Sequence, residues 1–376
     1  MLVVQGMMTA GSRITGDFHG FLLWSVLMVY AVGLLPERLG GRFRISHRWL
    51  GAVVVAASVP VQIVAYFHSV DNAEAALMVE LSRIVEITHA NVYADVDGFL
   101  ALVEIAKAAA IANAAALFPN IHLLALYSVL TLPILFYFSL QPGNAMRWLF
   151  LLALLGDFWL LMKTQSRPGF LALLAGSLAV VPLLSFRLAL AALAAAILVP
   201  TGLYVTGAFG FGARVTELIE HFAREERLAM WRETLALLQA NSVSEWIFGH
   251  GFGQFLLDYK AYSSFHGQQD FSFPHNFVLE LLYSHGVLGL VLVVGGYIGL
   301  FRLLVKALRG GIEGTYRQLG LLLICVLTVH GVHTFLTLPI FSRPALFPLS
   351  LILGAAFRFL RGLGSDLDGQ HDSQPV

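Results

Sequence analysis

Residues 274–301 have the sequence PHNFVLELLYSHGVLGLVLVVGGYIGLF. After Pro274, His275 and Asn276 this segment is almost wholly apolar, and Glu280 is the only Asp, Glu, Lys or Arg in it. A helix of about 20 apolar residues is long enough to cross the hydrocarbon core of a bilayer. The segment therefore predicts a transmembrane helix over 276–301 that begins where a polar loop reaches the membrane surface.

The composition of the whole chain agrees with this interpretation. Of the 376 residues, 58% are hydrophobic and 12% are charged, and the mean hydropathy is +0.77. Soluble globular domains carry about 25% charged residues. We predict an all-α polytopic integral membrane protein with about ten, and up to twelve, transmembrane helices. The candidate spans are residues 18–36, 49–69, 98–118, 121–140, 146–163, 169–185, 187–206, 276–301, 319–340 and 344–361.

Charge and cysteine content exclude other classes of protein. The formal net charge is zero, so the chain has no basic field of the kind that attracts nucleic acid. The single cysteine, Cys325, excludes a disulfide within the chain and a cysteine metal cluster. The first 17 residues lack a short apolar stretch followed by a cleavage site, so we expect no cleavable signal peptide.

The polar interruptions divide the chain into four predicted parts. Residues 1–206 are expected to form N-terminal membrane helices, and 207–274 a long periplasmic loop with short helices. Residues 275–363 are expected to form the C-terminal membrane helices, and 364–376 a disordered cytoplasmic tail. The loop 207–274 holds five Lys or Arg, eight Asp or Glu and thirteen aromatic residues. The loop therefore has no excess of basic residues that would attract anions in general. An anion would have to be bound there by individual arginines.

The orientation follows from Lys and Arg near the span ends, which favour the cytoplasm. Arg302, Lys306 and Arg309 follow the span 276–301, so the loop before that span is predicted to face the periplasm of a Gram-negative cell. The N-terminal third leaves two alternatives, which depend on whether 98–118, with its charged Glu104 and Lys107, is a full span or a re-entrant segment.

The loop contains a predicted helix, 213–240, with candidate anion ligands. Arg224, Arg227 and Trp231 fall on one face of this helix by their spacing of three and four residues. A guanidinium can bind a diphosphate through two parallel hydrogen bonds. The alternative is a surface helix whose arginines pair with nearby glutamates.

A second candidate lies between two apolar segments, in the sequence Ser166-Arg167-Pro168-Gly169. Proline is well tolerated in the first turn of a helix, and the N–H groups there attract anions. Arg167 would lie at the membrane surface beside a lipid diphosphate. The alternative is an interfacial anchor that reaches the lipid headgroups.

His275 is a candidate base. A helix N-terminus disfavours additional positive charge, so we expect the pKa of His275 to be lowered and the ring to be neutral near pH 7. Asn276 is expected either to cap the helix or to bind a sugar hydroxyl. Glu280 lies one turn further and could orient a substrate or pair with another helix. The alternative for His275 is a histidine without function at a capped helix start.

The remaining histidines and glycines favour structural roles. Gly249-His250-Gly251-Phe252-Gly253 has glycines at alternate positions, which permit positive φ and close approach of another backbone. We predict a structural turn, with a function for His250 as the alternative. His330 and His333 share a helix face without a nearby carboxylate, so we expect interhelical hydrogen bonds rather than a metal site. No metal and no cofactor are predicted.

Five short motifs together resemble the O-antigen ligase and polymerase family of bacterial membrane glycosyltransferases. Each is weak alone, but their order and spacing are fairly specific over about residues 117–300, roughly half of the chain. They are Phe118-Pro119-Asn120 before a span ending near Leu132-Pro133, Thr164-Gln165-Ser166-Arg167, Arg227-x-x-x-Trp231, Phe248–Gly253 and His275-Asn276-Phe277.

The resemblance implies a metal-independent, inverting glycosyltransferase of the bacterial inner membrane. Its donor would be a glycan on undecaprenyl diphosphate, and its acceptor lipid A–core in a ligase or another lipid-linked glycan in a polymerase. Arg167 and Arg227 would then bind the diphosphate, and His275 would act on the acceptor hydroxyl. Arg224, Trp231, His250, Asn276 and Glu280 are secondary candidates. A transporter of lipid-linked sugars is a third alternative, although no internal repeat supports it.

Overall fold

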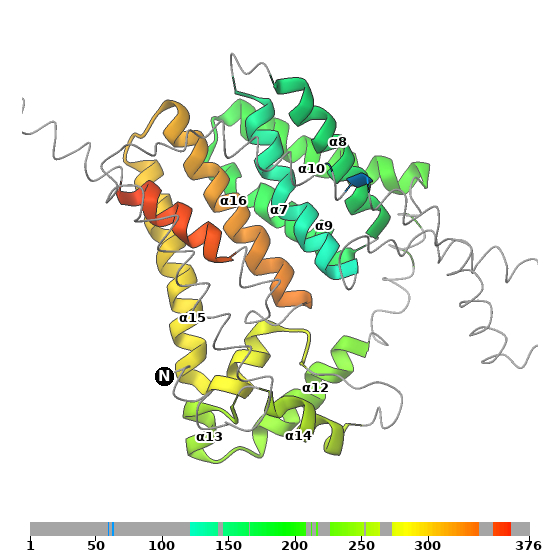
Figure 1. Ribbon diagram of the computed structural model, residues 1–376, viewed down its shortest axis with the longest axis vertical. Coiled ribbons are helices and arrows are strands. Elements are labelled where there is room, and N and C mark those ends of the chain that lie inside the picture. The colour runs from blue at the N-terminus through cyan, green and yellow to red at the C-terminus, as the bar shows by residue number, and fades with distance from the viewer. Residues whose placement is uncertain are drawn as a thin grey trace, which may run out of the picture. The chain divides into compact units, whose positions relative to one another are not determined.

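The computed structural model describes residues 59, 62–63, 121–141, 146–164, 166–207, 212, 216, 226–251, 253–263, 273–337 and 349–361. All regular structure within these residues is helical, as the hydropathy pattern predicts (Figure 1). The helices in chain order are α7 (Ile121–Ser139), α8 (Arg147–Thr164), α9 (Arg167–Val180), the 3-10 turn η1 (Val181–Leu183), α10 (Phe186–Thr206), α12 (Glu226–Gln239), α13 (Val243–Phe248), α14 (Gln254–Tyr262), α15 (Phe277–Arg309), α16 (Gly314–Thr337) and a last helix over residues 349–361.

Most of the spans predicted from residue 121 onward correspond to helices. The predicted start of the span 276–301 is correct to one residue, because α15 begins at Phe277, but α15 continues for two more turns, to Arg309. α16 likewise begins five residues earlier than predicted. The spans 18–36 and 98–118, nearly all of 49–69, and the tail 364–376 lie outside the described residues.

The protein is an integral membrane protein. Among the described residues, three helices are long and apolar enough to cross a bilayer: His122–Ser139, Phe277–Arg309 and Tyr316–Thr337. Large apolar side chains also point outward along the helices, for example Leu152, Leu155 and Leu292, each at least 60% exposed. Such surfaces are costly in water but are satisfied by lipid tails. The total number of spans remains a prediction.

The described residues divide into two compact units, and the first comprises those within the ranges 45–170 and 201–214. In this unit α7 packs along α8. Asp157 of α8 is fully buried and accepts hydrogen bonds from Thr131 of α7 and from Gln62. A buried carboxyl inside an apolar helix needs such polar partners.

Among the described residues, the other unit comprises 171–200 and those that follow 214, and it contains α12 to α16. The helices α12, α13 and α14 gather around the N-terminal end of α15 (Figure 1). A cluster of buried apolar side chains holds them there: Met230 and Leu238 of α12, Phe255 and Tyr259 of α14, and Leu279 and Tyr283 of α15. Burying these side chains removes several hundred square ångströms of apolar surface from water, which is the main force that fixes α12 on α15.

α15 and α16 lie side by side in this unit, and a polar contact joins them inside the apolar region. The hydroxyl of Tyr297 on α15 lies 2.6 Å from Nδ1 of His330 on α16. This confirms the predicted interhelical hydrogen bond for His330. Nδ1 of His333 instead lies 3.0 Å from the hydroxyl of Thr337 on its own helix.

Candidate functional site

α12 carries two side chains that reach the start of α15 and the end of α16. Trp231 donates a hydrogen bond from Nε1 to the carbonyl of Pro274, at 2.9 Å. One turn earlier on the same face, Arg227 donates from Nη1 to the carbonyl of Leu336, at 3.1 Å. Arg227 and Trp231 therefore lie on one face of α12, as their spacing predicts, and this face points at the segment before α15 and the end of α16. Arg224 lies outside the described residues.

His275 is held in an unusual backbone conformation next to these contacts. Its φ is 49°, in the left-handed region that residues other than glycine rarely adopt. Nδ1 of the ring lies 2.9 Å from the carbonyl oxygen of Thr337. A carbonyl oxygen only accepts, so Nδ1 carries the hydrogen. In the neutral ring the lone pair then belongs to Nε2, which is the atom able to take up a proton.

The surroundings of His275 favour the neutral ring. Burial is the largest cause and lowers the pKa of His275, and the nearby positive charge of Arg227 lowers it further, although the hydrogen bond to Thr337 opposes both. The predicted direction of this pKa shift is confirmed. The largest cause is burial, not the N-terminus of the helix that the sequence suggested.

Asn276 and Glu280 occupy the first turn of α15. The side-chain oxygen of Asn276 accepts hydrogen bonds from the backbone N–H groups of Val278 and Leu279, so Asn276 is the N-cap of the helix. This confirms the capping alternative for its oxygen. Glu280 is 5% exposed, and its backbone N–H donates to the carbonyl of Asn276.

Arg227 and His275 both contact the C-terminal end of α16, which the sequence did not predict. The last carbonyls of a helix have no partner within the helix and carry its negative partial charge. Here the carbonyls of Leu336 and Thr337 accept from Arg227 and His275, so one helix end orients both side chains. The signal in the sequence was Pro339, because proline often follows the end of a helix.

Arg167 lies in the unit with α7 and α8, at the first position of α9. Ser166 accepts a hydrogen bond from the N–H of Gly169 through its side chain, so it caps this helix as a residue of that type should. The predicted helix start at Arg167 is confirmed. Its role as a ligand remains a prediction.

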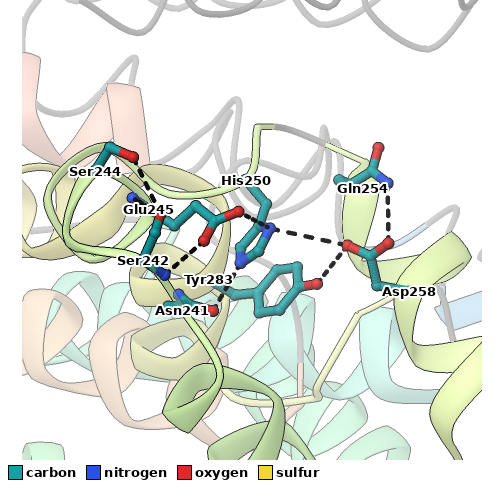
Figure 2. Close-up of polar contacts among 8 residues, drawn as sticks. All are labelled: Asn241, Ser242, Ser244, Glu245, His250, Gln254, Asp258 and Tyr283. Atoms are coloured by element: carbon teal, nitrogen blue, oxygen red, sulfur yellow. Dashed lines mark hydrogen bonds and ion pairs between the residues drawn. The ribbon is translucent and has the colours of Figure 1, made fainter.

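His250 lies in a cluster of polar side chains around the glycine-rich turn (Figure 2). Nε2 of His250 is 2.9 Å from the side-chain oxygen of Asn241, and its ring stacks on Tyr283 with ring centroids 4.5 Å apart. Gly249 and Gly251 have positive φ values of 75° and 101°. The predicted structural turn is confirmed. Among the described residues, no group of three or more His, Cys, Asp or Glu side chains is placed to hold a metal ion.

Residues 148–294 match the family model described as O-antigen ligase. This segment belongs to the O-antigen ligase family. The match extends from the start of α8 into α15, so it contains Arg167, Arg227 and His275, whereas Leu336 and Thr337 follow it. A search of curated proteins gives no match. The family indicates a membrane glycosyltransferase of the O-antigen ligase or polymerase type, with lipid-linked glycans as substrates.

Proposed function

We propose that this O-antigen ligase family protein transfers a glycan from undecaprenyl diphosphate to a lipid A–core acceptor at the periplasmic face of the inner membrane, with inversion at the anomeric carbon. The observation that carries this proposal is the arrangement of Arg227 and His275 on the end of α16. It places a cation and a neutral imidazole together, and this reaction needs both.

His275 is the proposed general base. The acceptor hydroxyl loses its proton to Nε2 while its oxygen forms the new bond to the anomeric carbon of the donor sugar. The bond from that carbon to the diphosphate oxygen breaks in the same step, and undecaprenyl diphosphate leaves. One displacement inverts the anomeric configuration, so no nucleophilic side chain is needed.

Arg227 is the proposed ligand of the departing diphosphate. Negative charge grows on the leaving oxygen in the transition state, and a fixed guanidinium stabilises it without moving. The contact with Leu336 supports this role, because it holds the guanidinium in place before substrate arrives. Arg167 is proposed as a second diphosphate ligand from the family motif that it matches.

The test uses cells in which the gene is deleted and replaced by wild type, Arg167→Ala, Arg227→Ala or His275→Ala at matched protein levels. Surface lipopolysaccharide is separated on a gel, and the lipid-linked glycan is extracted in parallel. We expect each variant to lose long chains from lipid A–core while long polymer accumulates on the lipid carrier.

A polymerase would give a different result, because only its acceptor differs. The deletion would then leave single repeats on lipid A–core and no long polymer on the carrier. Normal glycans in the deletion cells and in all three variants would contradict both versions of the proposal. Arg232→Ala serves as the control for Arg227→Ala, because Arg232 is exposed on the same helix.

A further inference from the structure

α15 is broken close to its start, and the break isolates the part that follows His275. Gly286 has φ 64° and ψ −171°, which no continuous helix contains. Residues 277–285 thus form a separate first segment, about 13 Å long at 1.5 Å per residue. A break of this kind lets the two parts of a helix point in different directions. The membrane-spanning remainder of α15 therefore does not by itself fix where His275 lies.

The backbone N–H groups of the glycine-rich turn bind the C-terminal end of this first segment. In an unbroken helix the carbonyls of Tyr283 and Ser284 would accept from residues four positions later. At the break they accept instead from the N–H groups of His250, at 2.8 Å, and Gly251, at 3.0 Å. Gly249 makes room for this approach, since a Cβ there would lie 2.4 Å from the backbone of Ser284.

The side chain of His250 then links the first segment to α12. Its ring lies flat on Tyr283, with 12° between the ring planes. Its Nε2 donates to the side-chain oxygen of Asn241, which lies two residues after the end of α12. α12 is the helix that carries Arg227 and Trp231. One imidazole therefore contacts both the segment that follows His275 and the end of the helix that bears Arg227.

Two carboxylates lie near the other nitrogen of the ring (Figure 2). Nδ1 of His250 lies 3.8 Å from Glu245 of α13 and 4.0 Å from Asp258 of α14. Hydrogen bonds from Ser242 lower the pKa of Glu245, which keeps that carboxyl ionised. Asp258 also accepts from the Tyr283 hydroxyl, so the ring and its stacking partner share one carboxylate.

We propose that His250 is a positioning residue for the glycosyl transfer, holding the first segment of α15 against the end of α12 and so fixing His275 relative to Arg227. This inference rests on the proposed function. His250 does not touch the reacting atoms, because the length of the first segment separates it from His275. It acts through His275, whose burial and contact with Thr337 depend on where that segment lies.

The test measures the titration of His275 directly in the purified full-length chain. Diethyl pyrocarbonate modifies neutral imidazoles, and mass spectrometry of the peptide containing His275 gives its extent of labelling as a function of pH. In His250→Ala we expect the midpoint for His275 to rise toward the ordinary histidine value of about 6.5, because looser packing admits water. Ser244→Ala, on the exposed side of α13, should leave the midpoint unchanged.

Four further measurements test the positioning role and separate it from loss of the fold. His330 should stay poorly labelled in His250→Ala, since it is fully buried between helices. His250→Gln keeps an N–H near the position of Nε2 and should restore most of the wild-type profile. Asn241→Ala removes the same hydrogen bond from its other partner and should shift the midpoint as His250→Ala does. In deletion cells, His250→Ala should slow transfer of long chains at least about tenfold.

An unchanged midpoint for His275 in folded His250→Ala and Asn241→Ala would overturn the positioning role. A shifted midpoint with undiminished transfer would overturn its link to the reaction. The proposed function is tested separately, because it fails if His275→Ala itself leaves transfer intact.

Discussion

His275 combines three constraints in one residue, and each has a consequence for its chemistry. Its positive φ directs the ring toward the end of α16, the carbonyl of Thr337 selects the tautomer, and burial opposes protonation. A residue keeps a strained conformation only where several surrounding contacts hold it there. These constraints together describe a neutral imidazole with a defined basic nitrogen.

The pH dependence of the reaction should reflect the lowered pKa of His275. A general base works only when it is deprotonated, so transfer is lost as the pH falls through its pKa. Because burial lowers that pKa below about 6.5, the wild-type enzyme should keep most of its activity at pH 6.5. Transfer rates measured from pH 4.5 to 8 check this. An acid limb with its midpoint above 7 would contradict a buried, neutral His275.

The contribution of Arg227 to the transfer rate should depend on the planar geometry of its guanidinium as well as on its positive charge. Arg227→Ala should lower the transfer rate roughly a hundredfold, the cost of removing one transition-state donor. Arg227→Lys should recover only part of the loss, because an ammonium cannot make two parallel hydrogen bonds to a diphosphate. Arg232→Ala, one position beyond Trp231, should behave as wild type. Equal rates for the Arg227 and Arg232 variants would show that Arg227 binds no substrate.

At the residue scale, sequence reasoning located the side chains but not their partners. The spacing of Arg227 and Trp231 was enough to place them on one face, and Asn276 was recognisable as a helix cap. The carbonyls of Leu336 and Thr337 could not be foreseen, since every residue has a carbonyl. Only the folded chain shows that α16 ends beside His275.

At the scale of elements, the glycine-rich turn and the break in α15 pack directly against each other through their backbones. Gly249 and Gly286 approach each other closely, so that a Cβ on either would meet the backbone of the other element within 2.4 Å. The alternate glycines of the turn were visible in the sequence. The break at Gly286 was not, because an apolar run with several glycines looks like one continuous span.

Gly286→Ala should separate α13 from α15. The new Cβ would meet the carbonyl of Ile247 at 2.3 Å, and φ of 64° adds strain of about 1–3 kcal/mol. We expect a lower midpoint of thermal unfolding in detergent and faster proteolysis of residues 241–263. Gly295→Ala is the matched control on the same helix, because a Cβ there meets nothing within 4 Å. Its stability should be unchanged or slightly raised. Similar unfolding midpoints for both variants would argue against a packed break.

At the scale of the whole molecule, hydropathy was sufficient to predict the fold class. The bilayer offers no hydrogen-bond partners, so the backbone groups of each span must hydrogen-bond within their own helix. Hydropathy was sufficient for the length of α7, but it missed the last two turns of α15 and the first five residues of α16. It does not determine which helix ends come together, since lipid-facing and protein-facing apolar side chains look alike in a sequence. The convergence of α12, α15 and α16 therefore came from the structure alone.

The orientation of the molecule can be tested with single cysteines. The only native cysteine, Cys325, is first changed to serine, and Ser244→Cys on α13 or Ser373→Cys in the tail is then introduced. The basic residues at the end of α15 predict that this end is cytoplasmic and that α13, on the other side of the span, faces the periplasm. A maleimide that cannot cross membranes should thus label Ser244→Cys in intact cells permeabilised only at the outer membrane. Ser373→Cys should react only after the inner membrane is opened. The reverse pattern would place Arg227 and His275 on the cytoplasmic side, where a periplasmic donor could not reach them.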